Sequence, residues 1–118
     1  MIARAELFEF SEAHFRIKAD YPFDKFPAYA VLRHDNDGKW FCLVMNVPRH
    51  LLGLAGEKEV DVIDIKCYPE KVADLKLKKG FRPAYHMNKE HWLTVVLDGT
   101  VPKKEVFALI KESFELTK

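Results

Sequence analysis

The sequence has few of the residues that mark cross-linked, fibrous or disordered chains. Its 118 residues include two cysteines, five glycines and six prolines, while 48% are hydrophobic and 31% are charged. Two cysteines cannot build a disulfide-rich scaffold, and so little glycine and proline excludes collagen-like or low-complexity structure. Cys42 and Cys67 both lie in apolar segments, where a free thiol behaves as a small hydrophobe. We therefore expect both thiols to be buried and reduced.

The chain also lacks a long apolar run and an excess of one charge. No apolar segment approaches the roughly 20 residues of a membrane-spanning helix, and the first residues lack the layout of a signal peptide. Nineteen Lys and Arg against eighteen Asp and Glu leave a net charge of +1, so no overall field attracts nucleic acid or membrane. The sequence therefore predicts a cytoplasmic globular protein whose residues 1–118 form one domain.

Hydrophobic periodicity and turn residues predict the order helix, three strands, helix, two strands, helix. The expected helices cover 3–12, 69–80 and a segment that opens at Pro102; the expected strands cover 29–34, 39–45, 60–67 and two short segments between Pro83 and Leu97. Residues 46–59 should form a loop with one helical turn near Leu51. This order predicts an α+β fold, in which helices pack on one face of an antiparallel sheet.

The third predicted strand carries an informative alternation. Ile63, Ile65 and Cys67 should share one face, while Asp64 and Lys66 point to the other. An acid and a base at alternate positions of an otherwise apolar strand indicate that the second face is exposed to solvent or forms part of a site.

Positive charge is concentrated in one segment. Residues 66–91 contain seven Lys or Arg and three Asp or Glu, a local balance of +4. At its end, from Tyr85 to Trp92, aromatic and basic residues are interleaved, and these are the residue types that stack on bases and contact phosphates. The alternative is an ordinary solvated helix and loop, in which Asn88 shapes a turn and Trp92 packs in the core.

Catalytic and metal-binding patterns are weak. His86, His91 and Cys67 are the candidate zinc ligands, but they lack the paired spacing of zinc sites. Cys67 with either histidine is the one plausible nucleophile and base, and no glycine-rich phosphate loop is present. An enzyme that used a histidine as acid or base would need an enclosed pocket beside it. We therefore predict a non-enzymatic protein with no catalytic residues, metal or cofactor.

Two motifs are distinctive: Lys66-Cys67-Tyr68-Pro69-Glu70 and Ala84-Tyr85-His86-Met87-Asn88-Lys89-Glu90-His91-Trp92. Both resemble the MmcQ/YjbR family. The resemblance extends to the segments 22–23, 38–41, 97–102 and 111–116, so it covers nearly the whole chain. It implies a compact two-layer α-β3-α-β2-α domain, similar in fold to type III secretion chaperones and to double-wing DNA-binding domains.

Because the family is commonly labelled DNA-binding, the resemblance implies a DNA-binding face around residues 66–91. Its residues would be Lys66, Arg82, His86, Asn88, Lys89, His91 and Trp92. The lysines and the arginine would contact phosphate, and His86, Asn88 and Trp92 would shape the site. The competing prediction is a chaperone-like adaptor, since the related chaperone fold binds extended polypeptide. The sequence leaves the oligomeric state open.

Overall fold

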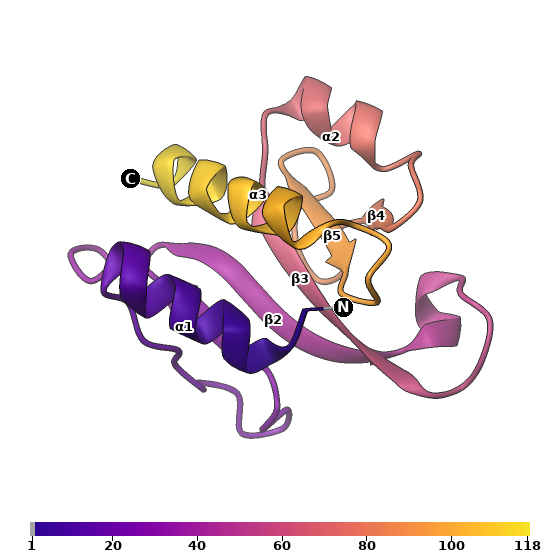
Figure 1. The fold of residues 1–118 in the computed structure, drawn as a ribbon, viewed down its shortest axis with the longest axis horizontal. Coiled ribbons are helices and arrows are strands. Elements are labelled where there is room, and N and C mark those ends of the chain that lie inside the picture. The colour runs from indigo at the N-terminus through magenta and orange to yellow at the C-terminus, as the bar shows by residue number, and fades with distance from the viewer. Residues whose placement is uncertain (1) are drawn as a thin grey trace.

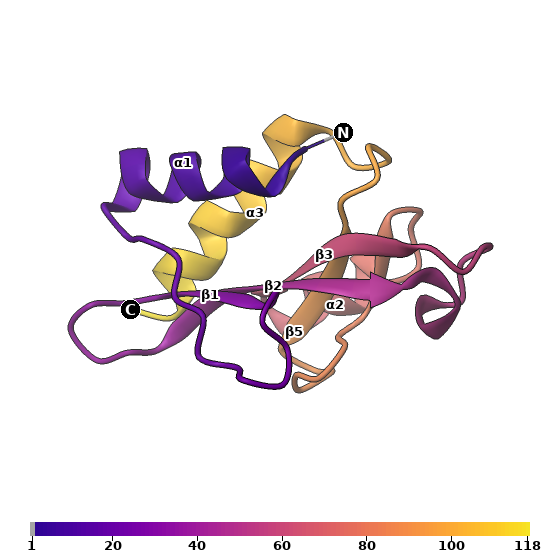
Figure 2. The ribbon, with the colours of Figure 1, turned by 90° about the horizontal axis from the view of Figure 1, so that it is seen from below.

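The computed structural model describes residues 2–118 and confirms the α+β fold. Its elements are α1 (Arg4–Phe15), β1 (Ala30–Arg33), β2 (Trp40–Pro48), the 3-10 helix η1 (Arg49–Leu52), β3 (Glu59–Lys66), α2 (Pro69–Leu75), β4 (Phe81–Pro83), β5 (Trp92–Val96) and α3 (Lys103–Leu116). The five strands form one sheet in the order β1-β2-β3-β5-β4, and all neighbours are antiparallel. Helices α1 and α3 cover one face of the sheet, while the segment between α1 and β1 crosses the other (Figures 1 and 2).

The sheet separates two apolar cores. The core beneath the helices contains Ile63, Ile65 and Cys67, which confirms the predicted alternation in β3. The second core, on the opposite face, contains Val62 and residues of β1, β2 and β5. Cys42 and Cys67 are both buried with free thiols, as predicted. Because both faces are apolar, each must be covered, the second one by loops.

Four predicted boundaries were wrong, the first being the end of α1, which runs to Phe15 instead of residue 12. Strand β2 continues to Pro48, where a loop was expected; β4 ends at Pro83, whereas both short strands were expected after it; and α2 ends at Leu75 instead of reaching Gly80. Gly80 belongs to the turn into β4, where its φ of +88° favours glycine and a Cβ would meet Val101 Cγ2 at 2.6 Å. Its carbonyl also accepts the Val96 N–H at 2.8 Å. The glycine is therefore required by the packing of the turn and does not mark the helix end.

A bulge interrupts the pairing of β1 with β2. Leu32 pairs with Cys42, but the next residue, Arg33, pairs with Trp40, so Phe41 is an extra residue without a partner on β1. The extra residue reverses the alternation. Phe41 joins the helix-side core together with its neighbour Cys42, and Trp40 packs against the second core.

Both edges of the sheet are short. Strand β1 has four residues, and its outer side is paired at one point, where Val31 and Asp20 exchange two backbone hydrogen bonds of 2.8 and 3.0 Å. At the opposite edge, β4 has three residues and ends at Pro83, which has no N–H to donate.

Within residues 2–118, every helix is too short or too polar to cross a membrane.

Candidate nucleic-acid interface

The predicted site residues gather on the face of the sheet that lies away from the helices. Lys66 pairs with Trp92, and Thr94, two positions along β5, pairs with both Asp64 and Arg82. These side chains therefore share the face of the second core. The other predicted residues belong to the loop 84–91 between β4 and β5, whose Met87 packs against the same core.

Side-chain hydrogen bonds fix the conformation of the loop 84–91. Asn88 Oδ1 accepts the N–H groups of Glu90 at 2.9 Å and His91 at 3.1 Å, which forms a turn of the kind asparagine favours. Lys89 Nζ donates to the Ala84 carbonyl at 2.7 Å. His86 has a φ of +71°, which is rare for a residue with a Cβ. The loop thus holds an exposed histidine in a strained conformation.

Two lysines and both tryptophans of the chain meet in a hollow of about 330 Å³, here called the Trp–Lys hollow. It is lined by Lys39, Trp40, Lys66, Met87, Trp92, Leu116 and Thr117. Lys66 and Trp92 were predicted site residues, while Lys39 and Trp40 were not. Each lining residue is basic, apolar or a threonine, so the hollow carries positive charge beside indole rings.

A second hollow of about 280 Å³, the aromatic hollow, adjoins the first and shares Trp40 and Met87 with it. It is lined by Phe23, Phe26, Tyr29, Trp40, Leu43, His86 and Met87. A third hollow of about 390 Å³ shares Phe26, Tyr29 and His86 with the aromatic hollow and adds Lys25 and Glu59. The shared residues join the three hollows into one sheet groove.

The sheet groove collects some of the predicted residues and leaves out others. Lys66, Trp92 and His86 line it. Arg82, Asn88, Lys89 and His91 lie outside its three hollows, and the amide oxygen of Asn88 is occupied by the turn.

The basic side chains of residues 66–91 have different surroundings, since some form ion pairs and others are exposed to solvent. Lys71 Nζ lies 3.0 Å from Glu112 on α3, and Lys78 Nζ lies 3.6 Å from Asp74 on α2. Lys76 and Lys79 are exposed on the turn after α2. The local charge of +4 is therefore not a single surface, and the lysines of the Trp–Lys hollow come from β3 and from the β1–β2 hairpin.

Sequence periodicity could not have identified Trp40 as a groove residue. Counting alternate positions back from Leu43, which faces the groove, places Phe41 there and turns Trp40 toward the helices. The bulge at Phe41 reverses both positions. The one available signal was the composition of the Lys39-Trp40 pair after the hairpin glycine, a basic and an aromatic residue side by side.

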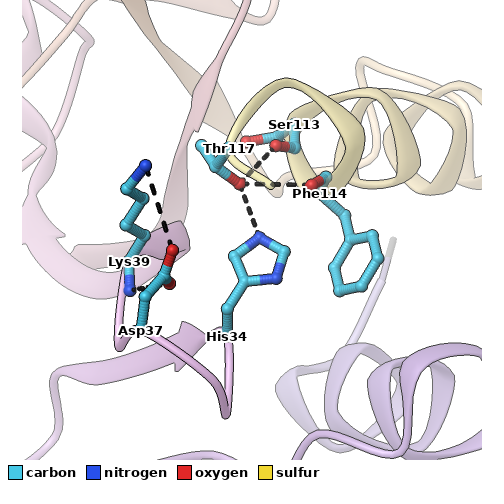
Figure 3. A network of polar contacts seen from close by, with 6 residues as sticks. All are labelled: His34, Asp37, Lys39, Ser113, Phe114 and Thr117. Atoms are coloured by element: carbon cyan, nitrogen blue, oxygen red, sulfur yellow. Dashed lines mark hydrogen bonds and ion pairs between the residues drawn. The ribbon is translucent and has the colours of Figure 1, made fainter.

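Figure 3 shows how α3 is fixed to the hairpin that carries Lys39. His34 Nε2 lies 2.8 Å from Thr117 Oγ1, and that hydroxyl donates to the Ser113 carbonyl at 2.8 Å. With its proton committed to the carbonyl, Thr117 Oγ1 accepts from His34, so His34 Nε2 carries a proton. Asp37 Oδ1 accepts the Lys39 backbone N–H at 3.0 Å. These contacts hold one wall of the Trp–Lys hollow.

Asp64 is a buried carboxylate on the groove side of the sheet. Its side chain is fully buried; Oδ1 accepts the Thr94 hydroxyl at 2.5 Å, and Oδ2 lacks a hydrogen-bond partner among the described residues. Burial raises the pKa of Asp64 to about 7, although the Thr94 hydrogen bond and the Lys89 charge act in the opposite direction. Thr94 Oγ1 also accepts the Tyr85 N–H at 2.9 Å, which connects Asp64 to the loop 84–91.

The fold and the groove define a small α+β domain with an aromatic and basic sheet face, and the family follows from comparison with known proteins. The YjbR family model matches residues 13–116. The chain therefore belongs to the YjbR family, which confirms the resemblance found in its motifs.

Relatives and solved structures agree with this assignment. The uncharacterized protein YyaQ of Bacillus subtilis is 42% identical over 118 residues, which cover 100% of both chains. The uncharacterized protein YjbR of Escherichia coli is 36% identical over 62 residues, 49% of this chain and 52% of that protein. A crystal structure from Pseudomonas syringae is 46% identical, with a TM-score of 0.96 over 99% of this chain and 100% of that one. A Deinococcus radiodurans protein at 24% identity, with a TM-score of 0.73 over 95% of this chain and 75% of that one, shares the fold.

Proposed function

We propose that the protein is a non-enzymatic nucleic-acid-binding protein and that its binding site is the sheet groove. The observation that carries this proposal is the Trp–Lys hollow, where Lys39 and Lys66 lie beside Trp40 and Trp92. Lysine ammonium groups contact phosphates, and indole rings stack on bases. This combination supports binding of the nucleic-acid backbone and bases at adjacent points.

The state of the two thiols supports binding rather than nucleophilic catalysis. Burial raises the pKa of the Cys67 thiol to about 11, with Glu112 adding to the effect, and burial also raises the pKa of Cys42 far above its usual range. A thiol nucleophile must be deprotonated and accessible. The proposal includes a cytoplasmic location, where nucleic acid is present and buried thiols stay reduced.

A peptide-binding adaptor is the second candidate, and the exposure of Phe26 favours it. Phe26 is 47% exposed at the mouth of the aromatic hollow, where an apolar peptide side chain could cover it. The charge of the neighbouring Trp–Lys hollow favours a polyanion over an uncharged peptide. Nucleic-acid binding that requires the groove lysines would therefore count against the adaptor.

The first prediction concerns those lysines. In a titration of a short labelled oligonucleotide followed by fluorescence anisotropy at about 50 and about 200 mM salt, the wild-type protein should bind more weakly at the higher salt. The double variant Lys39→Ala/Lys66→Ala should bind more weakly at both. Because it loses two phosphate contacts, its plot of log K against log salt should be shallower by about 1.5.

The matched control is Lys76→Ala/Lys79→Ala, which removes the same charge from the exposed turn after α2. Its affinity and salt slope should stay close to those of the wild type. Equal losses in the two double variants would show that binding depends on overall charge and would remove the groove from the proposal. An absence of wild-type binding at both salts would overturn the function itself.

A further inference from the structure

We infer that the ligand is a single strand and that one of its bases leaves the stack and enters the aromatic hollow. This inference rests on the proposed function and specifies the ligand of the same groove. It follows from the position of the helices, the arrangement of rings in the hollow, and the walls that the two hollows share.

The position of the helices disfavours recognition of a DNA duplex by the groove side of the sheet. Proteins read a DNA duplex most often by placing a helix in the major groove. Here α1 and α3 lie on the face of the sheet opposite the groove (Figure 2). The groove is formed mostly by strands and loops, with Leu116 at the C-terminal end of α3 as one lining residue. Its aromatic rings come from the strands and loops and can stack on a base that is free of its partner.

Aromatic rings line the aromatic hollow on more than one side. The Phe23 and Trp40 rings meet edge to face, with centroids 5.7 Å apart and an interplanar angle of 84°. The Phe26 and Tyr29 rings are stacked, with centroids 4.7 Å apart and an angle of 18°. Perpendicular rings of this kind offer both a face and an edge to a planar guest. Exposed Phe26 leaves the hollow open to an incoming base.

The shared walls connect base and phosphate sites. Trp40 and Met87 line the aromatic hollow and the Trp–Lys hollow alike. A base in the first hollow therefore brings its neighbouring phosphate to the second, where Lys39 and Lys66 supply the charge. The lysines at this position favour a nucleic-acid base over a peptide side chain as the guest.

The test compares one labelled oligonucleotide as a single strand and as a duplex with its complement. Trp40 and Trp92 are the two tryptophans of the chain and both line the Trp–Lys hollow, so tryptophan fluorescence, excited where tyrosine does not absorb, reports on the groove. We expect the single strand to bind at least about tenfold more tightly than the duplex and to quench the tryptophan fluorescence. The variant Phe26→Ala should lose about tenfold in single-strand affinity, the effect of one lost stacking contact.

Tyr68→Ala is the control, because Tyr68 is a 53% exposed aromatic residue that lies outside the groove. It should bind as the wild type does, and both variants remove rings that are about half exposed and outside the buried core, so both should fold. Duplex binding as tight as single-strand binding, still dependent on Lys39 and Lys66, would overturn the inference and leave the proposed function standing. Single-strand binding that is unaffected by Phe26→Ala and does not quench fluorescence would overturn base insertion. If neither form binds, both proposals fall.

Discussion

Replacing Ser113 with alanine should lower the free energy of unfolding by about 3 kcal/mol, because two buried backbone groups would lose their partner. Ser113 Oγ donates to the Phe41 carbonyl at 2.6 Å and accepts the Lys66 N–H at 2.9 Å. Phe41 is the extra residue of the bulge, and Lys66 lies just beyond the last pair of β2 and β3. One helix hydroxyl thus serves both a donor and an acceptor of the sheet backbone. Urea unfolding followed by circular dichroism measures the loss.

Ser11→Ala is the graded control for this experiment. Ser11 is as fully buried as Ser113, but its hydroxyl makes one bond, to the Ile17 carbonyl at 2.8 Å. Its loss should cost about 1 kcal/mol. Ser113→Ala should also shift the tryptophan emission, because the bulge that it supports orients Trp40. If the two alanine variants are equally stable, the bulge does not depend on the Ser113 hydroxyl.

The wild-type protein should lose stability as the pH rises from about 4 to about 7, because of Asp64. The pKa of this carboxyl is about 7 in the folded chain, against an ordinary value of 3.8. Between these values the folded chain holds a proton that the unfolded chain has released, so each step up in pH favours unfolding. The expected loss is on the order of 4 kcal/mol across this window, and above it Asp64 should add no further pH dependence.

The variant Asp64→Asn isolates this contribution. Asparagine can still accept the Thr94 hydroxyl but cannot ionise, so the variant should gain stability relative to the wild type as the pH rises. Subtracting the two curves removes the effect of other groups, such as Glu6, whose pKa is lowered mainly by its contact with Lys103. Denaturant unfolding at a series of pH values measures the difference. Parallel curves from pH 4 to pH 8 would show that Asp64 does not titrate in this range.

Local patterns predicted most of the fold because they are set by neighbouring residues. The alternation in β3, the turn residues before Lys39 and the apolar stripe of α3 each depend on a few adjacent positions. The second core was harder to foresee. The two prolines of the segment 21–27 suggest an extended connection, but the segment turns twice, with the Phe26 N–H donating to the Phe23 carbonyl and the Tyr29 N–H to the Phe26 carbonyl. These turns let Phe23 pack against the second core. Such packing depends on residues distant in the sequence.

The candidate site was only partly predicted, because it too depends on contacts between residues distant in the sequence. Lys66 lies in one of the two motifs and His86 and Trp92 in the other, and all three line the sheet groove. Lys39 and Trp40 were missed because their orientation depends on a bulge, which periodicity does not reveal. The asymmetry is physical: residue type indicates what a side chain can bind, whereas the pairing of strands decides where it points.

The short borders of the sheet limit how this protein can recognise other molecules. Many adaptors capture an extended peptide by adding it as a further strand, which requires a free row of backbone donors and acceptors. At one edge the backbone of Val31 is already paired with Asp20, and at the other edge a strand of three residues ends at Pro83. Neither edge offers a long row of free backbone groups, so strand addition and edge-to-edge aggregation are both disfavoured. Recognition would therefore depend on side chains of this protein, which would contact the rings and charges of a partner rather than its main chain.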